Sequence, residues 1–108
     1  MADWAADVHK HVKNADDEAI AGVVHHCGIA LHKQDSSLVS FSDPEELKRV
    51  REGFMKKKLA RTESDADLDA ALASVGEKLK GEHRKNRVTV YYMLADHYGQ
   101  LGLFKKKA

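Results

Sequence analysis

The chain has little cysteine, little proline and no long apolar run. Its single cysteine, Cys27, cannot form a disulfide within one chain, and so few thiols fit a reducing compartment. No stretch approaches the ~18 consecutive apolar residues of a membrane-spanning helix. The N-terminus has neither the basic segment nor the apolar segment of a signal peptide. We therefore expect a cytoplasmic protein with no membrane partner.

An excess of one charge is also missing. The 18 lysines and arginines nearly balance the 17 aspartates and glutamates, so the formal net charge is +1. Such a chain has no strong overall field that would attract nucleic acid or an anionic membrane. Hydrophobic residues make up 43% of the 108 residues, which is ordinary for a soluble globular chain of one domain. We predict one helical domain over residues 1–104 and a basic, solvated tail over 105–108.

What is present is a charge pattern that repeats along the chain. Acidic residues open three apolar periodic stretches, at Asp16–Glu18, Asp43–Glu46 and Asp65–Asp69. Basic residues close the second and third of these stretches, at Lys56–Lys58 and Lys78–Lys80. Charges placed in this order complement the helix macrodipole, which favours anions at the N-terminus and cations at the C-terminus. The pattern predicts an all-α fold.

The apolar spacing predicts five short helices in a compact array of antiparallel neighbours. They cover about residues 3–12, 16–32, 43–58, 64–80 and 86–98. The third has the clearest start, because Asp43 is a good N-cap, Pro44 suits the first helical position, and Glu46 completes a capping box. Gly22 and Gly28 lie inside the second helix, where each costs about 0.5–1 kcal/mol relative to alanine. We expect another helix to approach closely there.

Two segments outside these helices carry apolar residues. Residues 34–42 are predicted to form a loop, because a strand through Leu38–Phe41 has no obvious partner and could not satisfy its backbone. We expect Leu38, Val39 or Phe41 to pin this loop to the core. After the last helix, we expect the chain to fold back through Leu101, Leu103 and Phe104.

Seven histidines are many for a chain of this length. A metal ion needs ligands three or four residues apart on one helix face, or ligands from several elements. His25 and His32 are seven residues apart, too far to hold one ion without a third element between them. They are weak candidates, and a metal-binding helical protein that uses histidines of different helices is the first alternative function. No resident metal or other cofactor is predicted.

No motif for catalysis or nucleotide binding occurs in the sequence. The loop serines lack the Gly-x-Ser-x-Gly elbow, and there is no phosphate-binding loop. Residues 65–76 resemble a calcium loop, but Ala70 and Gly76 stand where such a loop needs glycine and glutamate. Cys27 lies on an apolar helix face, where a buried thiol acts as a small hydrophobe. We therefore predict no catalytic residue, and the sequence does not favour an enzyme.

Basic residues form three clusters, at Lys56–Arg61, Lys78–Arg87 and Lys105–Lys107. If the three met on one face they could contact phosphates, which makes weak nucleic-acid binding the second alternative function. Helix ends and a solubilising tail account for the same residues. The composition therefore argues against nucleic acid as the main partner.

Several stretches together resemble a small bacterial family, domain of unknown function 2853. The resemblance is carried by residues 1–8, 14–17, 27–31, 35–41 and 85–92. It extends over nearly the whole chain, so the resemblance implies one complete member of the family. It implies no activity, ligand or cofactor.

Two of these stretches have a physical interpretation as a binding surface. Short polar residues at the start of the loop can hydrogen-bond their own backbone, and a helix start near residue 86 would bring together a cap, a guanidinium and two phenols. The candidate binding residues are Ser36, Ser37, Asn86, Arg87, Tyr91 and Tyr92. The alternative is that Arg87 pins a neighbouring helix and that the tyrosines pack. The leading functional hypothesis is a small non-enzymatic helical interaction module, with a protein partner or with self-association.

Overall fold

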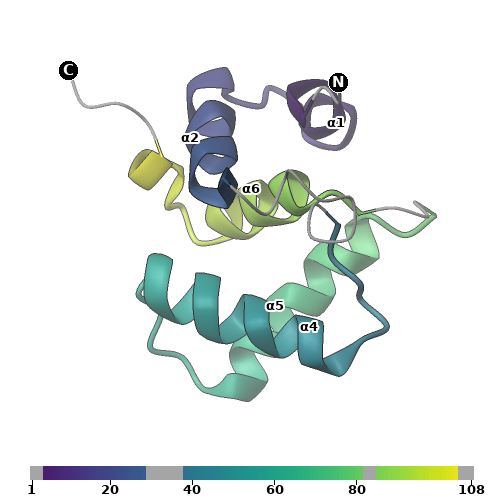
Figure 1. Cartoon of the computed structure of the whole chain (residues 1–108), viewed down its shortest axis with the longest axis vertical. Helices are drawn as coiled ribbons and strands as arrows, with labels where there is room; N and C mark the ends of the chain where they lie inside the picture. The colour runs from purple at the N-terminus through teal and green to yellow at the C-terminus, as the bar shows by residue number, and fades with distance from the viewer. Residues whose placement is uncertain (1–3, 29–37, 82–84, 105–108) are drawn as a thin grey trace.

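The computed structural model of the chain consists of helices stacked about one central helix (Figure 1). It describes residues 4–28, 38–81 and 85–104. The elements are α1 (Trp4–His11), α2 (Asp17–Cys27), α4 (Pro44–Arg49), the π-helix η2 (Val50–Lys58), α5 (Asp65–Lys78), α6 (Arg87–His97) and the 3-10 helix η3 (Leu101–Phe104). No strand occurs in these ranges, and one isolated antiparallel bridge joins Leu38 to Asn86. The all-α prediction is confirmed.

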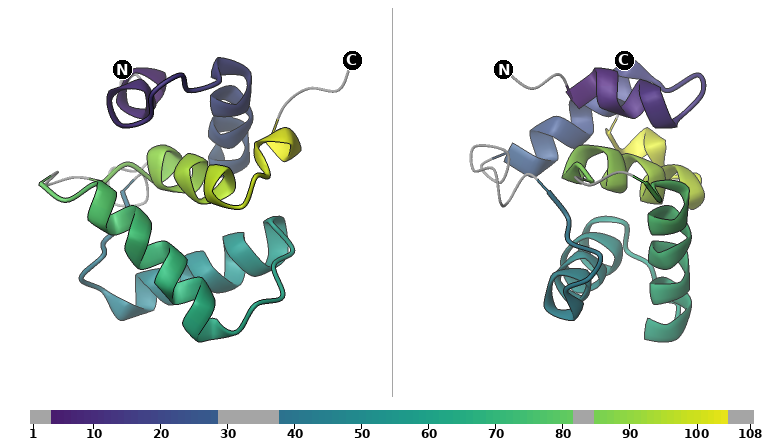
Figure 2. Two further views of the ribbon diagram at one scale, coloured as in Figure 1. Left: turned by 180° about the vertical axis from the view of Figure 1, so that it is seen from behind. Right: turned by 90° about the vertical axis from the view of Figure 1, so that its right-hand side faces the viewer.

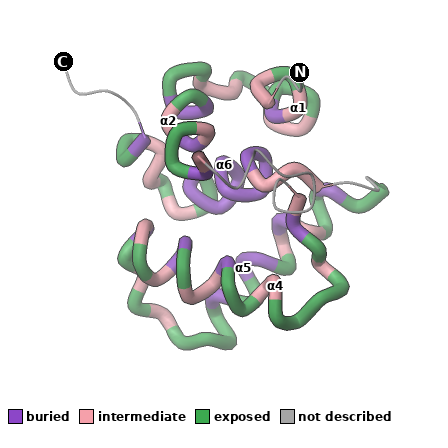
Figure 3. Tube along the Cα trace, viewed as in Figure 1, coloured by how far each residue is buried: buried purple, intermediate pink, exposed green. Residues whose placement is uncertain are grey.

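The central helix is α6. All its residues from Val88 to Ala95 are buried, as expected of a helix that is apolar around its whole circumference. Helices α1 and α2 pack on one side of it and α5 packs on the other. The three views show this order as an upper layer, a middle helix and a lower layer (Figures 1 and 2). Burial is correspondingly concentrated along α6 (Figure 3).

Hydrogen bonds tie α6 and the turn after it to distant parts of the chain. The Tyr92 hydroxyl accepts a hydrogen bond from the backbone N–H of Asp16 at 2.8 Å, and the Thr89 hydroxyl donates to Asp7. The Gln100 amide donates to the carbonyl of Leu59 at 2.9 Å. These bonds satisfy polar groups that α6 would otherwise bury.

Three of the predicted helix starts, at residues 16, 43 and 64, have a side-chain N-cap. The Asp16 carboxylate accepts from the N–H of Glu18 at 2.9 Å, and Ser64 accepts from the N–H of Asp67 at 3.2 Å. Asp43 accepts from the N–H of Glu45 at 3.0 Å, with Pro44 as the first residue of α4. The capping box of α4 is not formed as predicted, because the Glu46 carboxylate binds the Arg87 and Arg49 guanidinium groups. Hydrogen bonds between two charged groups are stronger than a bond to a backbone N–H.

The second helix ends earlier than predicted. Helix α2 stops at Cys27, and Gly28 caps it with φ +47° and the N–H donating to the Val24 carbonyl. The continuous helix expected through residue 32 is therefore wrong, and residues 29–37 lie outside the described part. The expected close approach is confirmed at Gly22, where a Cβ would overlap the backbone carbonyl of Phe104. It is wrong at Gly28, where a Cβ would meet nothing within 4 Å.

The third predicted helix continues beyond α4 as η2, which ends with the lysine triplet at Lys58. Three of its apolar residues are buried, namely Val50, Phe54 and Met55, and so is the C-cap residue Leu59. A π-helix has more residues per turn than an α-helix, so residues four, five and nine positions apart approach one face. The N–H of Leu59 bonds the Phe54 carbonyl five residues back, at 2.9 Å.

The two apolar segments outside the predicted helices reach the core in part. Val39 is buried, and its N–H donates to the carbonyl of Lys85 at 2.8 Å, which confirms the predicted pin. Phe104 is buried as predicted, but Leu103 is 50% exposed. The chain folds back as predicted, since η3 packs on α2 and α6, but a 3-10 turn of four residues can turn only part of its side chains inward, and Leu103 points outward.

Candidate functional site

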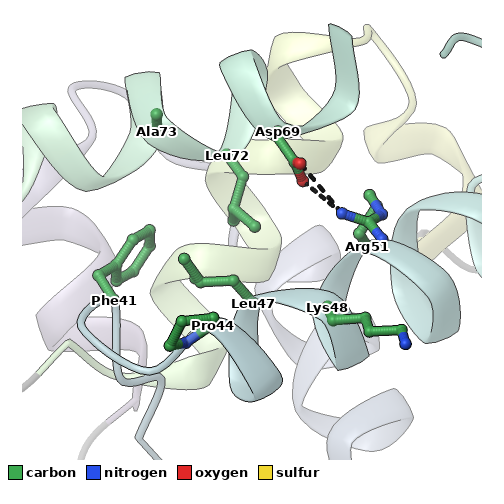
Figure 4. A pocket seen from close by; sticks show the side chains of 8 residues that line it. All are labelled: Phe41, Pro44, Leu47, Lys48, Arg51, Asp69, Leu72 and Ala73. Atoms are coloured by element: carbon green, nitrogen blue, oxygen red, sulfur yellow. Dashed lines mark hydrogen bonds and ion pairs between the residues drawn. The ribbon is translucent and has the colours of Figure 1, made fainter. Parts of the chain in front are cut away.

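A groove of about 480 Å³ lies between the helices of the lower layer. One wall comes from α4 with the first turn of η2, and the other comes from α5 (Figure 4). Its apolar lining consists of Phe41, Pro44, Leu47, Leu72 and Ala73. This volume lies in the ~300–1,000 Å³ range of binding pockets, and an apolar lining with a few polar groups is their usual composition.

Each end of the groove is closed by a defined contact. At one end the Phe41 ring lies against Gly76, where a Cβ would stand 2.7 Å from the ring. At the other end the Arg51 guanidinium donates to both oxygens of Asp69, at 3.0 Å each (Figure 4). The groove is therefore a bounded depression between two helices.

The two cations of the lining differ in their partners. The Arg51 side chain is 16% exposed, and besides Asp69 it contacts Glu52 at 2.9 Å and Asp65 at 3.7 Å. Lys48 is exposed and makes no ion pair within the described part of the chain. The pKa of the Asp65 carboxyl is lowered mainly by its hydrogen bond with Lys56, and the charge of Lys48 lowers it least. Lys48 is thus the lining cation that is able to take an anionic partner.

Of the binding residues predicted from the sequence, none in the described part of the chain lines the groove, and Arg87 contacts α4 through Glu46. Arg87 donates to the Tyr91 hydroxyl at 2.9 Å, to the Leu38 carbonyl at 3.2 Å and to Glu46 at 2.5 Å. Asn86 is the N-cap of α6 but makes no capping bond with its side chain. The structure therefore brings Arg87 and Tyr91 together with the end of the loop.

The other members of that predicted set are separated from this pair. The Tyr92 side chain is buried and its hydroxyl meets the start of α2, away from Arg87. Ser36 and Ser37 lie outside the described residues. A binding role for the whole set remains a prediction.

The weak metal candidates are not brought together in the described structure. His25 is exposed on α2, and His32 lies outside the described ranges. His9 contacts the Asp17 carboxylate at 2.6 Å. Within residues 4–28, 38–81 and 85–104, no three histidine, cysteine, aspartate or glutamate side chains gather as a metal-binding group.

Most of the chain matches a known family. The family model described as "Protein of unknown function (DUF2853)" matches residues 3–102. The chain belongs to this family. None of the curated proteins matches it. In the described part, no helix is long and apolar enough to cross a membrane.

The Cys27 thiol of this family member is 8% exposed, as the sequence predicts. Burial raises its pKa to about 11, although nearby Arg87 opposes that shift. A thiol with so high a pKa holds little thiolate, which is the nucleophilic form. The neighbouring His26 is exposed, and its ring lies 5.5 Å from that of Phe54. Burial and then Lys58 lower the pKa of His26.

Most cations of the described basic clusters have intramolecular partners. Lys56 contacts Glu52 at 2.9 Å and Asp65 at 2.6 Å, and Arg61 contacts Glu63 at 2.6 Å. The Lys58 ammonium lies 5.3 Å from the centre of the Phe104 ring. Residues 82–84 and 105–108, which carry the rest of the clusters, lie outside the described ranges.

Sequence reasoning missed the groove, although it named several residues that form it. Phe41, one of the residues expected to pin the loop, and Leu47 of α4 are half-buried and pack against the core. The signal that could have been used is Gly76, a glycine inside a helix and next to the buried Val75. Such a glycine indicates a close approach by another group, here the Phe41 ring.

Proposed function

We propose that the protein is a small, non-enzymatic interaction module of the cytoplasm that holds a segment of a partner protein in the groove between α4 and α5. The observation that carries the proposal is the groove itself, with its apolar walls and exposed lysine. Grooves between helices commonly receive an apolar side chain or the apolar face of a helix. An anchor buried in such a pocket supplies most of the binding energy of an interface.

The lining supports binding more than catalysis. Its polar groups are Lys48, Arg51 and Asp69, and the last two neutralise each other. Both oxygens of Asp69 accept a hydrogen bond from the Arg51 guanidinium, so this carboxylate is already engaged within the protein.

A different protein is a better partner than a second copy. Among the described residues, Leu103 is the large apolar side chain that is most exposed. It belongs to η3, which packs on α2 and α6, whereas the groove is formed by α4 and α5. A copy that placed Leu103 in the groove would form a head-to-tail contact, which grows into chains unless the rotation closes a ring.

The two alternative functions predicted from the sequence have less support. Metal binding would need histidines that converge, and within residues 4–28, 38–81 and 85–104 no histidine belongs to a group of three potential metal ligands. Nucleic-acid binding would need unpaired cations, but Lys56, Arg61 and Arg87 are all paired with carboxylates.

The test places a photoreactive amino acid at Ala73 in the groove, or at Ala66 on the same helix, in living cells. Both positions are exposed, and Ala66 is not part of the lining. We expect a crosslinked adduct from position 73. Excess wild-type protein without the photoreactive residue should abolish this adduct by competition, whereas excess Ala73→Arg variant should not. An adduct of twice the protein's own mass would show that the groove holds a second copy of this chain and not a different protein. No adduct at position 73, or equal adducts at both positions, would overturn the proposal.

A further inference from the structure

We infer that the partner segment in the groove carries an acidic side chain beside its apolar anchor, and that this carboxylate pairs with Lys48. The inference rests on the proposed function and adds the chemistry of the occupant. It follows from the order of charges along the groove, which is apolar between Phe41 and the Arg51–Asp69 ion pair and cationic on the α4 rim.

The apolar part of the occupant is set by the walls. Leu72 is 2% exposed, while Leu47 and Phe41, which line the same groove, are half-buried. Half-buried apolar side chains that face each other across a groove gain burial when an apolar side chain enters between them. Leucine-like or aromatic anchors fit this lining, and a charged anchor would lose its hydration without a partner.

The charged part of the occupant is set by the difference between Arg51 and Lys48. Arg51 is already bound by Asp69, Glu52 and Asp65, so an incoming anion would have to displace a bidentate partner. Lys48 has no ion pair within the described residues and lies in the same lining. A basic occupant would meet Lys48 as a like charge, while both oxygens of Asp69 are occupied.

A protein segment fits this groove better than a free small molecule. A small ligand is held when its site buries ~70–90% of its surface, and its charged group usually meets a polar group fixed inside the pocket. Here Lys48, which has no ion pair within residues 4–28, 38–81 and 85–104, is exposed, while Leu72 of the same lining is buried. A protein partner covers such an exposed group with its own polar surface while one side chain fills the apolar part of the groove.

The experiment titrates the ¹⁵N-labelled protein with three short blocked peptides that differ in one residue. Each is an amphipathic helix with two leucines four residues apart and a glutamate, a glutamine or a lysine between them. The expected order of affinity is glutamate, glutamine, lysine, with the glutamate peptide about threefold tighter than the glutamine peptide, as for an exposed ion pair. This preference should shrink with added salt and disappear in Lys48→Met, while Lys57→Met, an exposed lysine of η2 outside the lining, should keep it.

The outcomes separate this inference from the proposed function. If the glutamate and glutamine peptides shift the amides of Leu47 and Leu72 with equal affinity, the charged contact is overturned and the groove remains a docking site. If the lysine peptide binds most tightly, the sign of the occupant is wrong. If 4-methylpentanoate, an apolar carboxylate without a backbone, binds as tightly as the glutamate peptide, the occupant is a small molecule. If no peptide shifts the groove amides, both proposals fail.

Discussion

At the scale of single residues, Arg87 connects more of the chain than its position at a helix start indicates. Its side chain is 12% exposed and meets Glu46, Tyr91 and the Leu38 carbonyl, which belong to α4, α6 and the loop. A guanidinium can serve several acceptors at once because its donors are fixed in a planar fork. This contact joins the element that forms one groove wall to the central helix.

Replacement of Arg87 by methionine should destabilise the protein by about 2–3 kcal/mol, because the Glu46 carboxylate would keep only its contact with Arg49 in a site where it is 13% exposed. The double variant Arg87→Met, Glu46→Leu should recover part of that loss, since it removes the poorly exposed carboxylate, while Arg49, whose side chain is 69% exposed, stays hydrated without it. Urea unfolding of the wild type, both single variants and the double variant measures the coupling. Additive effects of the two single substitutions would contradict this account.

At the scale of elements, small residues decide how closely the helices approach. Helix α2 and η3 touch at Gly22, whose Cα faces the Phe104 backbone. In the lower layer, Gly76 of α5 leaves room for the Phe41 ring that closes one end of the groove. Both glycines lie inside helices, where alanine would otherwise be favoured.

Gly22→Ala should therefore destabilise the protein by about 1–3 kcal/mol, because the added methyl group collides with backbone that cannot rotate away. The matched control is Gly53→Ala in η2, where a Cβ would meet nothing within 4 Å and the change should stabilise by about 0.5–1 kcal/mol. Chemical denaturation of both variants measures the difference. Stabilisation by Gly22→Ala would show that η3 does not pack on α2 as described.

At the scale of the whole molecule, α6 holds the two layers together. It contacts α1, α2, α5 and η3. The Cα radius of gyration is 12.8 Å, close to the ~13 Å of a folded domain of about this length. We propose that residues 1–104 unfold as one domain, with α6 as the last element to open.

Amide hydrogen exchange tests this proposal. The slowest amides should be those of Val90–Leu94, and their exchange should report global unfolding, because opening α6 exposes both layers at once. Amides of α1, which has one buried residue, should exchange faster through local opening. If the amides of α5 exchange more slowly than those of α6, the lower layer is the more stable unit and the one-domain proposal is wrong.

The sequence by itself determined the helical class, three of the helix starts and most of the buried positions. Caps and apolar spacing act within one or two turns, so Asp16, Asp43 and Ser64 can be recognised without knowledge of the fold. The tertiary structure decided what depends on contacts between distant residues. Glu46 does not form the predicted capping box because Arg87, 41 positions away, binds its carboxylate. The groove exists because Phe41 packs on Gly76 and Arg51 pairs with Asp69, and neither pairing leaves a periodic signal in the chain.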